Sequence, residues 1–144
     1  MIQNDTIKLL KECDKGIKMG ISSIDDVYDY AKDEKMRSAL YECRVKHERM
    51  KSEIEGMLGE YGDEGKNPNP MIKGMSWLKT NMKLAMKESD KTIASLMTDG
   101  CNMGVKSLSK FLNEYEAAEE KAKDITKKLI HEEEALAREM RGYL

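Results

Sequence analysis

Apolar and small residues follow one another at alternating steps of three and four along four stretches of this chain. The stretches cover residues 10–31, 36–61, 94–115 and 118–140. This spacing, about 3.5 residues on average, keeps one side of a helix against its neighbours through several turns. The pattern therefore predicts four long helices that share one core, as in a left-handed helix bundle.

Capping residues indicate where the first two helices begin and end. Asp5 or Thr6 can cap the first helix, which we expect to run to about Lys32. Asp33 can cap the second helix, which we expect to end near Tyr61. Because the connection between them is so short, these two helices should lie antiparallel.

A loop and an amphipathic segment separate this pair of helices from the second pair. The segment Gly62–Pro70 contains Gly and Pro residues that interrupt helices. The next 17 residues, 71–87, span about 25 Å as a helix at ~1.5 Å per residue, which is nearly the length of the bundle. One side of that helix would carry Met71, Met75, Leu78, Met82 and Ala85. We therefore predict an additional helix in this long crossover.

The second pair of helices is bounded by similar signals. We expect the third helix to begin after Glu88–Asp90 and to run from Lys91 to about Tyr115, although one continuous helix from Met71 is an alternative. The fourth helix should begin near Glu116 or Ala117 and run to about Arg141. The sequence thus predicts an all-α fold with a single helical-bundle domain over residues 1–144.

Composition and charge narrow the classes of partner. The chain of 144 residues has 25 Lys and Arg against 27 Asp and Glu, a formal charge of −2. Nucleic acid is disfavoured because its binding usually needs a concentrated basic face. A membrane partner is disfavoured too, because no uncharged run approaches the ~20 residues of a span. The first residues lack the pattern of a signal peptide, so we expect a cytoplasmic protein.

Three cysteines lie on the predicted apolar stripes, at Cys13, Cys43 and Cys101. An odd number on buried faces favours reduced thiols that pack as small apolar groups. The chain contains no CxxC motif, so neither a zinc ribbon nor a thioredoxin-type site is indicated.

Counting along the two hairpins places four side chains at one depth. A turn near residues 32–33 pairs residues whose numbers sum to about 64, and a turn near residue 116 pairs residues whose numbers sum to about 233. If the second and third helices run parallel from Asp33 and Asp90, residues at the same depth in the two helices differ by 57 in number. By this count the following four residues fall within about one turn of each other: Cys43, His47, Cys101 and Glu132.

These four side chains could hold one metal ion. Cys43 and His47 are spaced i, i+4 on one helical face, and Cys101 and Glu132 would complete a tetrahedron. Two thiolates, an imidazole and a carboxylate suit zinc or ferrous iron. The other interpretation is structural: His47 is a core histidine hydrogen-bonded to Glu132, and the buried cysteines only pack.

The order of two helices, a long crossover and two more helices resembles the ferritin-like four-helix bundle, from about Asp5 to Arg141. Residues 100–115 are similar to a small, uncharacterised bacterial branch of that family. The resemblance implies a dinuclear iron or manganese centre, built from a Glu on each of two helices and a Glu-x-x-His on each of the other two.

Most ligand positions that the resemblance implies carry other residues. The first helix has Ile17, and the third has Cys101, where a Glu is expected. Arg44 stands three residues before His47, and Ala135 three residues after Glu132. The sequence therefore predicts a degenerate di-metal site, and a di-iron oxidase becomes the least favoured hypothesis.

We accordingly expect a non-enzymatic structural or protein-interaction role without a di-iron centre or other cofactor, with a homodimer as one form of that interaction. The alternative is a mononuclear zinc or iron protein that uses Cys43, His47, Cys101 and Glu132. Among the 12 Met residues of the chain, those of the predicted crossover helix, Met71, Met75, Met82 and Met86, form with Trp77 an apolar surface. That surface either covers the bundle and fills its gaps or binds a partner.

Overall fold

A computed structural model describes residues 1–63, 65 and 89–144. Within these residues the chain forms four α-helices and no strand: α1 (Ile2–Tyr28), α2 (Glu34–Glu60), α4 (Ser89–Glu114) and α5 (Glu120–Arg141). The predicted all-α fold with four long helices is confirmed. The predicted crossover helix over residues 71–87, and the choice between one helix and two over residues 71–115, lie outside the described residues.

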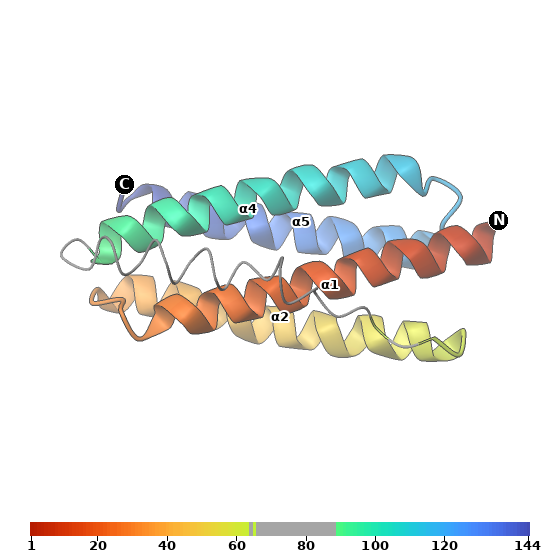
Figure 1. The fold of residues 1–144 in the computed structure, drawn as a ribbon, viewed down its shortest axis with the longest axis horizontal. Coiled ribbons are helices and arrows are strands. Elements are labelled where there is room, and N and C mark those ends of the chain that lie inside the picture. Colours follow the sequence, from red (N-terminus) through yellow and green to blue (C-terminus); the bar gives the residue numbers. More distant parts are fainter. Residues whose placement is uncertain (64, 66–88) are drawn as a thin grey trace.

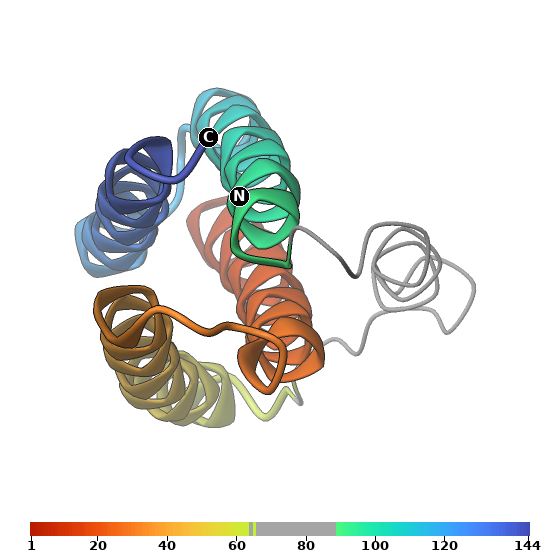
Figure 2. The same ribbon diagram turned by 90° about the vertical axis from the view of Figure 1, so that its left-hand side faces the viewer.

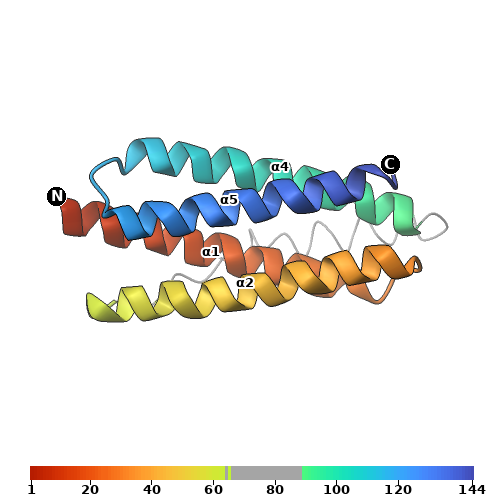
Figure 3. The ribbon, with the colours of Figure 1, turned by 180° about the vertical axis from the view of Figure 1, so that it is seen from behind.

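The four helices run along a common long axis, and the two chain termini lie at opposite ends of the molecule (Figure 1). The pairs α1–α2 and α4–α5 are antiparallel hairpins, as the short connections predicted. Seen along the bundle, α2 and α4 occupy opposite corners (Figure 2), and from behind α5 lies beside α2 (Figure 3). The two diagonal helices α2 and α4 point in the same direction.

Aspartates fix the end of the bundle where α1 turns into α2. Asp33 caps α2, and its side chain accepts a hydrogen bond from the Met36 backbone N–H at 2.9 Å. Asp90, in the first turn of α4, accepts hydrogen bonds from the backbone N–H groups of Lys32 and Asp33 at 2.7 and 3.1 Å. Asp33 and Asp90 therefore lie at the same depth, which is the predicted difference of 57 in residue number between α2 and α4. The predicted cap at Asp33 is confirmed.

At the other end of the bundle two predicted helix starts are wrong. Helix α1 begins at Ile2, and α5 begins at Glu120 rather than near residue 116. Asp5 and Thr6 hold the loop between α4 and α5 instead: they accept hydrogen bonds from the backbone N–H groups of Ala117 and Glu119. The short oxygen-bearing side chains that cap helices can equally satisfy backbone groups of a distant loop.

Two clusters of buried apolar side chains form the core. One lies toward the α1–α2 turn and includes Ile24, Met36, Leu40 and Met140, and the other lies toward the N-terminal end and includes Leu9, Leu10, Ile54 and Leu58. A polar layer between them contains His47, which is 1% exposed. This layer positions the candidate site.

All three cysteines are buried, and none forms a disulfide. Their positions in the core agree with the sequence interpretation of thiols that pack as small apolar groups. In the described part of the chain, no helix has the length and apolar character needed to cross a membrane.

Candidate functional site

The centre of the bundle holds a hydrogen-bonded pair between His47 on α2 and Glu133 on α5. The His47 Nε2 atom lies 2.9 Å from Glu133 Oε1, and His47 Nδ1 lies 2.9 Å from the backbone oxygen of Cys43. Both ring nitrogens therefore face oxygen acceptors when Glu133 is ionised. Since a neutral imidazole has only one N–H, this geometry favours the imidazolium, which donates from both nitrogens.

The surroundings of His47 change its acidity in two opposed ways. Burial alone lowers the pKa of His47, because desolvation disfavours the charged ring. Hydrogen bonds with the Cys43 side chain, whose Sγ lies 3.5 Å from His47 Nδ1, and with Glu133 outweigh this effect and raise the pKa of His47 to about 10. At neutral pH the pair is therefore a buried imidazolium and carboxylate whose charges cancel.

Glycines on the other two helices make room for the pair. A Cβ atom on Gly20 of α1 would lie 3.1 Å from the His47 ring atoms Cδ2 and Nε2. A Cβ atom on Gly104 of α4 would lie 3.3 Å from Glu133 Oε2. Each helix thus contributes one residue to this layer, and two of the four residues have no side chain.

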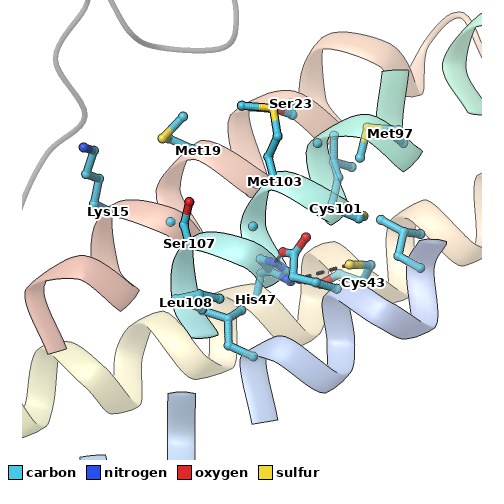
Figure 4. A pocket seen from close by; sticks show the side chains of 18 of the residues that line it. Lys15, Met19, Ser23, Cys43, His47, Met97, Cys101, Met103, Ser107 and Leu108 are labelled. Carbon is cyan, nitrogen blue, oxygen red and sulfur yellow. Dashed lines mark hydrogen bonds and ion pairs between the residues drawn. The ribbon is translucent and has the colours of Figure 1, made fainter. Parts of the chain in front are cut away.

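A pocket of about 340 Å³ opens beside the pair, between α1 and α4 (Figure 4). Glu133 and His47 form part of its lining, and Glu133 is 14% exposed. Most of the remaining lining is apolar and includes Met19, Met97, Leu108 and Phe111. Gly16, Gly20, Gly100 and Gly104 also line the pocket, so parts of both helical walls are bare backbone.

The structure brings together three of the four residues that the sequence predicted as a site. Cys43, His47 and Cys101 all line this pocket. Glu132 does not: its carboxylate lies 3.5 Å from Lys46 Nζ, and it lines a separate groove between α2 and α5. The carboxylate that reaches the pocket belongs to its neighbour, Glu133, so the placement of Glu132 is wrong.

The error comes from the starting point of α5. Because α5 begins at Glu120, the pairing sum of this hairpin moves above the expected value of about 233, and Gly104 faces Glu133. The spacing of seven residues does not decide this assignment from the sequence. Glu133 is seven residues from Thr126 and Met140, and Glu132 is seven residues from Ile125 and Glu139, so each has one polar and one apolar residue at that spacing. In the first hairpin, Gly20 rather than Ile17 faces His47.

The Cys101 thiol beside the pair favours its protonated form. Burial raises the pKa of the Cys101 thiol, and the nearby Glu133 carboxylate, to which it hydrogen-bonds, raises it further. Cys43 Sγ lies 3.5 Å from His47 Nδ1. Among the residues that the structure describes, no group of three or more His, Cys, Asp or Glu side chains is arranged to hold a metal ion.

The residues of this layer do not fit a dinuclear metal centre. Such a centre needs carboxylates on all four helices, but α1 and α4 present glycines here. Arg44, three residues before His47, instead forms an ion pair with Asp25, with Nε and Oδ1 2.6 Å apart. Leu136, three residues after Glu133, is buried in the apolar core.

A second buried carboxylate was missed by the sequence analysis. Asp14 on α1 is fully buried, and Lys18 Nζ lies 2.6 Å from its Oδ2 atom and 3.2 Å from a carboxylate oxygen of Glu55. Asp14 occupies a position beside the apolar stripe, directly after Cys13, and its i, i+4 spacing from Lys18 is the one signal for such a pair. The group ties α1 to α2 and lies outside the pocket.

The raised pKa of His47 predicts a loss of stability at alkaline pH. Protonated His47 contributes its full stabilisation below pH 6.5, the ordinary pKa of histidine. This contribution to the free energy of unfolding is lost as the pH rises toward about 10. Between those values the free energy of unfolding should fall by up to about 1.4 kcal/mol per pH unit. Urea denaturation from pH 6.5 to 9 measures this slope, which should disappear in His47→Gln. Equal slopes in both proteins would contradict the charged pair.

The close approach of Gly20 to His47 predicts a second, sharper effect. Gly20→Ala should push the ring away from Glu133, whereas Gly56→Ala adds a methyl group in open space on α2. Alanine generally stabilises a helix interior by roughly 0.5–1 kcal/mol over glycine, so Gly56→Ala is the matched control. We expect Gly20→Ala to be less stable than Gly56→Ala by about 1–3 kcal/mol in denaturant titrations. Equal stability would show that the layer has spare room.

Comparisons with known proteins show the fold and not a family. No family model matches the sequence, and no curated protein matches it. The structure is similar to the crystal structure of a DUF305 fragment from Deinococcus radiodurans, with a TM-score of 0.74. The similarity covers 96% of this chain and 93% of that chain at 14% sequence identity. At such low identity the likeness supports the all-α bundle alone.

Proposed function

We propose that this chain is a non-enzymatic helical-bundle protein of the ferritin-like superfamily, from its small uncharacterised bacterial branch, that acts in the cytoplasm through binding. The observation that carries this proposal is the content of the middle layer, where Gly20, His47, Gly104 and Glu133 face one another. In this proposal the layer lies where a ferritin-like bundle would hold its metals, and it lacks the carboxylates on α1 and α4 that such a centre needs.

The helix order supports the ferritin-like assignment. Two antiparallel hairpins are joined by the long stretch between α2 and α4, and α2 and α4 are parallel at opposite corners. One long crossover of this kind is the arrangement of ferritin-like bundles.

The chemistry of the middle layer supports a non-enzymatic role. Both ring nitrogens of His47 are engaged, one with Glu133 Oε1 and the other with the Cys43 carbonyl. A catalytic acid or base must be free to exchange its proton with a substrate near the working pH. The raised pKa of His47 and its two hydrogen bonds disfavour such an exchange.

The partner that we propose is a protein, with a second copy of this chain as the first candidate. Met103 on α4 is 67% exposed and offers an apolar anchor on the outer surface of the bundle. Light scattering measures the mass in solution, and we expect that of a dimer, reduced to that of a monomer by Met103→Glu. A monomeric mass for the wild-type chain over the micromolar range would contradict the homodimer.

A mononuclear metal protein is the second candidate, because Cys43, His47 and Cys101 do line one pocket. Glu133 would replace Glu132 as the fourth ligand. Zinc or iron bound there would require His47 to leave the Cys43 carbonyl or Glu133, and both thiols to lose their protons.

Metal quantitation distinguishes the two candidates. We expect protein purified without chelator to contain far less than one zinc or iron ion per chain. One ion per chain that is lost in His47→Ala but kept in His131→Ala, the matched control at an exposed histidine, would establish the mononuclear alternative. Two iron ions per chain would contradict both.

A further inference from the structure

His47 and Glu133 form the floor of the α1–α4 pocket, and the Glu133 carboxylate can accept more hydrogen bonds than the protein supplies. A carboxylate offers about four lone-pair positions on its two oxygens. Glu133 Oε1 receives the N–H of His47, and the carboxylate also receives the weak S–H donor of Cys101. Glu133 retains 14% exposure beside the pocket, so a donor entering the pocket can still reach it.

The net charge of the floor selects a neutral donor. Imidazolium and carboxylate cancel, so an incoming ammonium group would leave a net positive charge in a buried site, and a carboxylate would face Glu133 directly. A hydroxyl group brings one donor and no charge.

The walls of the pocket select a flat apolar body. Gly16 and Gly20 on α1, and Gly100 and Gly104 on α4, leave stretches of backbone without side chains. Thioether sulfurs make favourable contacts with aromatic rings, and Met19, Met97 and Met103 all line the pocket (Figure 4). Phe111 adds an aromatic side chain.

The size of the cavity sets the size of the ligand. Since a cavity of ~150 Å³ holds benzene, 340 Å³ holds roughly twelve non-hydrogen atoms. We propose that this pocket binds a small neutral phenol, with its ring between the glycine-bearing faces of α1 and α4 and its hydroxyl donating to Glu133. Met103, proposed above as the anchor for a second copy of the chain, also lines this pocket, so the two proposals share one side chain.

Isothermal titration calorimetry with 4-butylphenol tests the proposal on the full chain. We expect saturable binding of one molecule per chain. The isosteric probe 4-butyltoluene, which has a methyl group in place of the hydroxyl, should bind at least roughly ten-fold more weakly, because it leaves Glu133 without the new hydrogen bond. The cationic probe 4-butylbenzylamine should also bind more weakly.

Two glycine variants locate the site. Gly100→Leu places a large side chain in the pocket, since a Cβ atom on Gly100 meets nothing within 4 Å and Gly100 lines the cavity. Gly56→Leu is the matched control, because it places the same side chain in open space on α2 away from the pocket. We expect Gly100→Leu to lose binding at least roughly ten-fold and Gly56→Leu to retain it. Circular dichroism confirms that both variants keep their helices.

Four results would overturn the proposal: no saturable heat with 4-butylphenol, equal affinity for 4-butyltoluene, tighter binding of 4-butylbenzylamine, or equal loss in the two glycine variants. The light-scattering and metal experiments measure mass and metal content, whereas the titration measures the heat of phenol binding to metal-free wild-type protein, so each result is obtained without the others even though the metal alternative and Met103 involve the same pocket. The two proposals are therefore tested separately.

Discussion

The hydrogen-bonded pair of His47 and Glu133 determines how the four helices meet at the centre of the bundle. Two apolar clusters lie on either side of it, and each helix brings one residue to the layer between them. Burying both charges costs solvation energy, so the pair is tolerated only where its geometry is good and its other hydrogen bonds are made. The Cys43 carbonyl supplies one such bond, and the glycines on α1 and α4 supply the space. A polar pair of this kind has one favourable partner arrangement, which fixes the depth at which α2 and α5 meet. The same two glycines that admit the pair also leave part of the helical walls bare, so the pocket between α1 and α4 follows from the same packing.

Much of the fold could be predicted because it depends on local signals. The apolar stripes gave four long helices, and the short turn before Asp33 gave an antiparallel hairpin with its cap in the right place. The offset of 57 between α2 and α4 followed from two aspartates at helix starts, and Asp90 does reach the turn that contains Asp33. The depth at which Cys43, His47 and Cys101 meet follows from this offset, and these three residues line one pocket.

The predicted starts of α1 and α5 and the placement of Glu132 were wrong because the same local pattern is compatible with two structures. Asp5 and Thr6 are good capping residues, yet their oxygens bind the loop before α5, a partner more than a hundred positions away in the chain. Without that contact the start of α5 was placed too early, and the pairing sum of the second hairpin moved with it. A stripe with alternating steps of three and four also leaves two adjacent positions at the edge of the seam. Only the register between helices decides between Glu132 and Glu133, and register depends on contacts that no single helix contains. The pocket could not be predicted at all, because its walls are made by missing side chains on two different helices.

The protonation state of His47 tests the central claim most directly. Nitrogen NMR of the histidine side chains reports whether each ring nitrogen carries a proton, and a spectrum of His47→Gln identifies the signals of His47. At about pH 8, well above the ordinary histidine pKa of 6.5, we predict that both nitrogens of His47 are protonated. A bare nitrogen on His47 at that pH would show that no buried ion pair joins α2 to α5, and it would contradict this account of the layer and its pocket.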